Sequence, residues 1–227
     1  MKGRLQIGRN VRQNAVLEKI VVKTAVKTVL AILAILVVVF AVFNFAFPQH
    51  MATFSENIGN YSLAVKYSAL RYSYTGDGMD LARCFEDSVS LGNDDYIIKY
   101  GEELTARQDY SSVCDRKEQE FAELNDKYFG ENVTYDYNQR VNGKIAVAYF
   151  HKGDDENAVL VALCANGTES FVSGNALATL YLEIIAEGDS RAAGVMLSAL
   201  SQISPTDGEE AQSLGEVISS LEELAAD

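Results

Sequence analysis

A single long apolar run interrupts an otherwise mixed pattern of hydrophobic and polar positions. Residues 28–47 read TVLAILAILVVVFAVFNFAF, in which only Thr28 and Asn44 are polar. At ~1.5 Å of rise per residue, a helix of this length spans the ~30 Å hydrocarbon core of a bilayer. The rest of the chain is too small and too polar to bury such a helix in a soluble core. The pattern therefore predicts a transmembrane helix over 28–47, followed by a juxtamembrane segment over 48–61.

Beyond residue 61 the pattern changes to short amphipathic segments, in which apolar residues recur at helical spacing. Val65, Ala69 and Tyr72 share one face of the first predicted helix, and Leu81 and Phe85 share one face of the second. Turn segments join one predicted helix to the next at Gly76-Asp77, Gln108-Asp109, Gly153-Asp154 and Gly188-Asp189. Two of the three intervals between these turns are close to ~34 residues, and the middle interval is longer by roughly one loop.

Small residues stand where paired helices would cross, with aromatic or large apolar residues beside them. Ala69 and Tyr72 precede the first turn, Ala146 and Tyr149 precede the third, and Pro205 ends the helix after the fourth. On these residues the chain resembles the tetratricopeptide repeat family over about 62–207. The resemblance is strongest over 174–207 and 62–95. It implies an all-α fold, an α-solenoid of helical hairpins.

The chain departs from the family pattern at several positions. Leu81 and Tyr181 stand where the family has small residues, Asn93 where it has Pro, and Gln108 where it has a turn Gly. An alternative interpretation takes 143–164 as a β-hairpin, since KIAVAYFH and NAVLVALC are rich in Val and the intervening KGDDE suits a turn. We favour helices there, because the Ala-rich second half agrees with the repeat spacing.

A final helix is predicted over 208–227. Thr206 and Glu209 have capping-box spacing. One face of the segment is apolar, and it consists of Ala211, Leu214, Val217, Ile218, Leu221 and Leu224. Repeat arrays need such a helix to cover the last exposed core. A dimerising coiled coil is the alternative, but the segment holds barely two heptads.

The charge distribution gives the predicted transmembrane helix a direction. Residues 1–27 contain seven Lys or Arg residues and one acid, a net charge of +6, so the remainder carries −19 of the total −13. Basic residues beside a membrane helix stay in the cytoplasm. We therefore expect a basic cytoplasmic tail over 1–27, attracted to anionic lipids, and an extracytoplasmic repeat domain. The acidic domain should be repelled by an anionic membrane, and its charge argues against nucleic acid as a partner.

A cleaved signal peptide is the alternative to a permanent anchor. Signal peptides have an apolar run of ~7–15 residues followed by a small-x-small cleavage site. Here the run is longer, and the following FAFPQHMA contains no such site free of Pro. We therefore expect an uncleaved single-pass protein in the cell membrane.

Few residues suggest catalysis. The two histidines, His50 and His151, are far apart in the sequence, and no hydrolase, nucleotide-binding or zinc motif occurs. Cys84, Cys114 and Cys164 lack metal-ligand spacing. We expect them to be small buried residues, with one disulfide as the alternative. The sequence thus predicts no catalytic residue, no metal and no cofactor.

The family resemblance implies a partner-binding groove lined by the first helix of each hairpin. Its predicted residues are Lys66, Leu70, Tyr74, Ile98, Glu102, Arg140, Val147, Phe150, His151, Leu182 and Ile185. Only two of these are Lys or Arg, so the basic clamp with which some family members hold a C-terminal carboxylate is absent. An apolar, aromatic groove suits an amphipathic or extended apolar segment. For each single residue, packing against a neighbouring helix is the alternative.

These features predict a membrane-anchored, non-enzymatic scaffold or adaptor that binds other proteins at the membrane face. In architecture the chain is similar to bacterial translocon-associated repeat proteins, which assist exported chains. That similarity is one of fold, and it sets an expectation for function without defining a mechanism. The alternative is an accessory subunit of an envelope enzyme complex, or a homo-oligomer.

Overall fold

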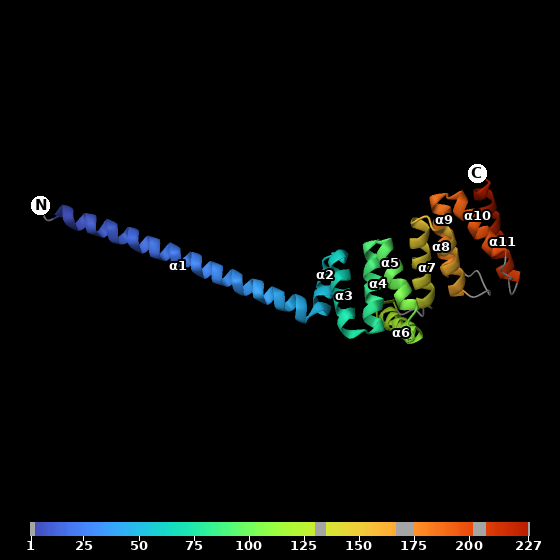
Figure 1. Cartoon of the computed structure of the whole chain (residues 1–227), viewed down its shortest axis with the longest axis horizontal. Coiled ribbons are helices and arrows are strands. Elements are labelled where there is room, and N and C mark those ends of the chain that lie inside the picture. Colours follow the sequence, from blue (N-terminus) through green and yellow to red (C-terminus); the bar gives the residue numbers. More distant parts are fainter. Residues whose placement is uncertain (1–2, 130–134, 167–174, 202–207, 227) are drawn as a thin grey trace. The chain divides into compact units, whose positions relative to one another are not determined.

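The computed structural model describes residues 3–129, 135–166, 175–201 and 208–226. These ranges form eleven α-helices and contain no strand (Figure 1). The predicted all-α class is therefore confirmed. The helices are α1 (Gly3–Ala46), α2 (Pro48–Asn57), α3 (Tyr61–Thr75), α4 (Gly78–Leu91), α5 (Asp94–Thr105), α6 (Tyr110–Phe129), α7 (Tyr137–His151), α8 (Asp155–Asn166), α9 (Ala176–Glu187), α10 (Ser190–Leu200) and α11 (Gly208–Ala225).

The chain divides into two compact units, Met1–Met51 and Ala52–Asp227. The first unit holds α1, which is long and apolar enough over Val21–Phe43 to cross a membrane. Every side chain described over 21–43 is exposed. This candidate span begins and ends earlier than the predicted 28–47, and it includes Lys23 and Lys27. An exposed apolar helix near the N-terminus is compatible with an anchor and with a signal sequence.

In the second unit, the four predicted turns each connect two helices, and three of them use the same chemistry. Gly76, Gly153 and Gly188 have φ of 62°, 74° and 69°, which a residue with a Cβ rarely adopts. The following Asp then accepts from a backbone N–H of the next helix. The Asp77 carboxylate lies 2.8 Å from Met79 N and that of Asp189 lies 3.0 Å from Ala192 N. A Gly-Asp pair thus ends one helix and begins another.

The β-hairpin alternative for 143–164 is wrong, because these residues form most of α7 and α8. The reason lies in the burial of α7. Val141, Ile145 and Ala148 contribute to one hydrophobic core and Ala146 and Phe150 to a second. A helix buried on two faces needs apolar residues at nearly every position. Its sequence therefore resembles a buried strand.

The two cores meet at α7. The first is built from α3, α4, α5, α6 and α7, with Leu81, Phe85 and Leu104 completely buried. The second joins α7 to α8, α9, α10 and α11. In α11, Leu214, Val217 and Leu221 are buried against α10, as the apolar stripe predicted. Ala211 of the same stripe is exposed.

Helix directions change within the array. The α5 and α7 helices run antiparallel, since Gly101 faces Ile145 while Asp94 reaches His151 at the other end. The α7 and α9 helices run parallel, since Gln139 accepts from Ala176 N and Gly143 faces Thr179. The α6 helix packs on α4 and α7. The helices are thus paired mostly with their sequence neighbours, and α7 additionally packs on α5 and on α9, its neighbours but one.

The cysteines differ from expectation at one position. Cys84 and Cys114 are buried, as predicted, whereas Cys164 on α8 is exposed. All three are free thiols, so the disulfide alternative is not realised in this structure.

Gly101 should be intolerant of a side chain. A Cβ at this position would lie 2.6 Å from two carbons of Ile145 and 3.2 Å from Phe85, and both neighbours are core residues. Overpacking costs about 1–3 kcal/mol, more than the gain of up to about 1 kcal/mol from replacing a helical glycine. We expect Gly101→Ala to lower the free energy of unfolding of the full chain, measured by denaturant titration in detergent.

Gly194 supplies the matched control. It lies within α10, and a Cβ there would meet no atom within 4 Å. Gly194→Ala should therefore raise the free energy of unfolding by up to about 1 kcal/mol. If the two substitutions changed the free energy of unfolding equally, the close approach of α5 and α7 at Gly101 would be contradicted.

Candidate functional site

The groove predicted from the family resemblance would be lined by α3, α5, α7 and α9. Side-chain hydrogen bonds connect these helices in series. The Tyr72 hydroxyl on α3 donates to Glu103 on α5 at 2.8 Å, and the Tyr149 hydroxyl on α7 donates to Glu102 on α5. The hydrogen bond to Glu102 raises the pKa of Tyr149 to about 12, so this donor keeps its proton at neutral pH. Hydrogen bonds between side chains therefore connect α5 with α3 on one side and with α7 on the other.

The predicted groove residues fall into three groups. The exposed ones are Lys66, Tyr74, Glu102, His151, Leu182 and Ile185. Leu70, Ile98 and Arg140 are half-buried. Val147 and Phe150 are buried, 9% and 6% exposed, and Phe150 belongs to the second core. Their side chains serve packing, because α7 is enclosed by helices on both sides.

Arg140 on α7 forms an ion pair with α4, the second helix of the first predicted hairpin. Its guanidinium lies 3.0 Å from the Glu86 carboxylate on α4. This ion pair helps to hold α7 on α4. The Arg140 guanidinium, which the groove prediction assigned to partner binding, is therefore already paired with Glu86.

His151 lies at a junction of three helices. Its Nδ1 is 3.4 Å from Asp94 on α5, and its Nε2 is 3.3 Å from Glu183 on α9. The neighbouring Lys152 forms an ion pair with Asp95. The C-terminal end of α7 is thus held between α5 and α9 by polar contacts. Motif reasoning missed Asp94 and Glu183, because their contacts join helices distant in sequence.

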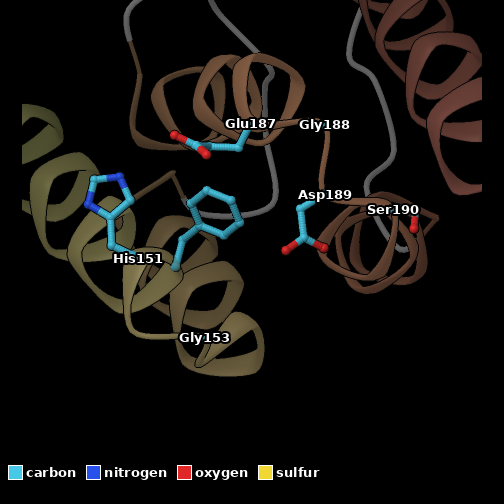
Figure 2. Close-up of a pocket in the computed structure, with 7 residues that line it drawn as sticks. His151, Gly153, Glu187, Gly188, Asp189 and Ser190 are labelled. Atoms are coloured by element: carbon cyan, nitrogen blue, oxygen red, sulfur yellow. The ribbon is translucent and has the colours of Figure 1, made fainter.

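A cleft of about 600 Å³ opens beside this junction. Figure 2 shows His151, Glu187 and Asp189 around its open space. It is lined by Phe150, His151, Gly153, Glu187, Gly188, Asp189 and Ser190. The α7–α8 turn forms one side and the α9–α10 turn the other. Glu187 and Asp189 would suit a positively charged group of a partner.

Exposed apolar side chains lie on α9, the helix that supplies Glu187. Leu182 is 64% exposed and Ile185 is 37% exposed, one helical turn apart. The opposite face of α9 is packed, since Leu177, Leu180 and Ile184 are buried. Both exposed residues belong to the predicted groove. Within that prediction, α9 offers the largest exposed aliphatic side chains.

A second group of titratable residues connects α2 with α4. Ser68 donates to the Asp87 carboxyl group at 2.6 Å, and Asp87 shares a hydrogen bond with Glu56. Arg83 lies 2.8 Å from Glu56. Burial raises the pKa of Asp87 to about 6, with a further contribution from Glu56. Burial also acts on Glu56, but the hydrogen bond and charge of Arg83 bring its pKa below the ordinary value.

Neither group forms a metal centre. Among the residues that the structure describes, no three His, Cys, Asp or Glu side chains are placed to hold a metal ion. Both groups join helices through hydrogen bonds and ion pairs, and the cleft lies beside the group around His151.

No family model, no curated protein and no solved structure matches this chain.

Asp87 should make stability depend on pH. Between about pH 4 and pH 6 the folded protein holds a proton on Asp87 that an unfolded chain, whose Asp has an ordinary pKa of 3.8, has released. The contribution of Asp87 to the free energy of unfolding therefore falls as pH rises from about 4 to 6, by roughly 3 kcal/mol at most. Asp87→Asn keeps an acceptor for Ser68 and removes the titration. We expect the variant to gain stability relative to the native chain as pH rises, measured by denaturant titration from pH 4 to 7.

Asp126→Asn is the control, since Asp126 is an exposed residue on α6. The stability difference of Asp87→Asn from the native chain should change with pH by more than that of Asp126→Asn. If the two variants showed the same pH dependence, Asp87 would not be the titrating group.

Proposed function

We propose that the chain is a single-pass membrane protein whose extracytoplasmic helical domain is a tetratricopeptide-like scaffold that binds segments of other proteins. The observation that carries the binding role is the exposed apolar pair Leu182 and Ile185 on α9, the helix that also forms one side of the cleft. The paired helices and Gly-Asp turns support the likeness to tetratricopeptide repeats.

The membrane attachment is supported by α1. Every side chain described over 21–43, its apolar part, is exposed. Transfer of apolar surface out of water favours burial in lipid. The seven basic residues of 1–27 favour a cytoplasmic N-terminus. The length of the apolar run and the lack of a Pro-free small-x-small site in the following FAFPQHMA favour a permanent anchor.

The chemistry of the surface defines the kind of segment that it would bind. Leu182 and Ile185 offer apolar contact. Glu187, the last residue of α9, and Asp189, which precedes α10, offer carboxylates. An amphipathic segment with apolar residues and a nearby Lys or Arg would satisfy both. The net charge of −19 after residue 27 would speed the approach of such a segment.

The binding surface can be tested with a photo-crosslinking amino acid at position 182. Leu160 on α8 is a matched control, because it is also a leucine, 55% exposed, and lies outside the predicted groove. We expect protein adducts from position 182 in living cells, and several-fold fewer from position 160. Introducing Ile185→Glu into the same chain should remove the adducts. Equal adducts from both positions would contradict a partner site on α9.

The orientation can be tested through the cysteines. Only Cys164 is exposed, whereas Cys84 and Cys114 are buried. A membrane-impermeant maleimide added to intact spheroplasts should label the chain, and Cys164→Ser should abolish the labelling. An N-terminal tag should remain on the labelled chain if the anchor is uncleaved. Labelling that requires permeabilisation would place the domain in the cytoplasm and overturn the proposed orientation.

A further inference from the structure

The α2 helix, which follows the apolar helix in the chain, has two contrasting faces within the second unit. Ala52 and Ser55 are completely buried. On the other side, Phe54 and Ile58 are 56% and 58% exposed. Ile58 N donates to Phe54 O at 3.2 Å, so the two side chains are one helical turn apart and share a face.

The inner face of α2 is held firmly on α4. Arg83 on α4 donates to the Glu56 carboxylate at 2.8 Å and to the Thr53 hydroxyl at 2.7 Å. Because α2 is fastened in this way, whatever covers Phe54 and Ile58 also orients the domain.

The position of this face in the chain indicates what covers it. Phe54 follows the end of the apolar run by seven residues, so even a fully extended chain would separate Phe54 from Phe47 by only about 25 Å. No Lys or Arg occurs between Pro48 and Val65, and the acid Glu56 is paired with Arg83. Apolar and aromatic side chains without unpaired charge, close to a membrane span, favour the bilayer interface.

We propose that Phe54 and Ile58 insert into the interfacial region of the outer leaflet and hold the helical domain against the membrane. This inference rests on the proposed membrane anchor. It replaces the expectation that the acidic domain is repelled and stands away from the lipid surface. The α2 helix acts as an interfacial helix, packed on protein with one face and on lipid with the other. The surface on α9 is then presented to partners in a defined orientation relative to the membrane.

The native chain contains no tryptophan, so single-tryptophan variants report on one site each. We would reconstitute full-length Phe54→Trp in nanodiscs of phosphatidylcholine, one chain per disc, with and without brominated acyl chains. Bromine quenches tryptophan only at close range. We expect strong quenching and blue-shifted emission for Phe54→Trp, and reduced quenching when Ile58→Glu is added. Leu160→Trp, on an equally exposed leucine of α8, should not be quenched.

Val37→Trp, within the apolar run, separates the two proposals. If Val37→Trp is quenched and Phe54→Trp is not, the anchor stands and the interfacial helix is overturned. If neither is quenched, the anchor itself fails, and the interfacial helix with it. If Phe54→Trp is shielded from aqueous iodide but not quenched by bromine, protein covers this face, which also overturns the lipid contact.

Discussion

The burial of α7 on two sides is the constraint on which the second unit depends. Its residues complete two hydrophobic cores, one shared with α3 to α6 and the other with α8 to α11. Two glycines allow the close packing: Gly101 lets α5 approach Ile145, and Gly143 lets α9 approach through Thr179. Without this helix each core would lose one wall, and neither set of helices could bury its apolar face.

The same constraint determines where binding chemistry can lie. Val147 and Phe150 are used for packing, and Arg140 is used in an ion pair with Glu86. The exposed surface that remains for the proposed partner lies at the ends of α7 and α9, where His151, Glu187 and Asp189 surround a cleft. The polar contacts of His151 with Asp94 and Glu183 stiffen this end of the array. The proposed scaffold function suits such an arrangement, because the side chains proposed to recognise a partner project from helices that are anchored in a core.

Local sequence signals predicted the fold well where they act through adjacent residues. Gly76-Asp77 and Gly188-Asp189 end one helix and cap the next, and this chemistry needs no distant partner. The apolar stripe of α11 also anticipated its buried side through Leu214 and Val217. Signals that depend on long-range packing were less informative. The continuous apolar character of 143–150 suits a strand as well as a doubly buried helix, and only the surrounding helices distinguish the two.

The sequence by itself determined the apolar helix, the charge asymmetry around it, and the positions of the turns, because composition and local backbone preferences are properties of short segments. It also showed the absence of familiar catalytic motifs. The tertiary structure decided which groove residues remain exposed, the antiparallel packing of α5 on α7, and the fastening of α2 to α4 through Arg83. Those features arise from contacts between residues distant in the chain, and no periodicity within a helix encodes which neighbour will cover which face.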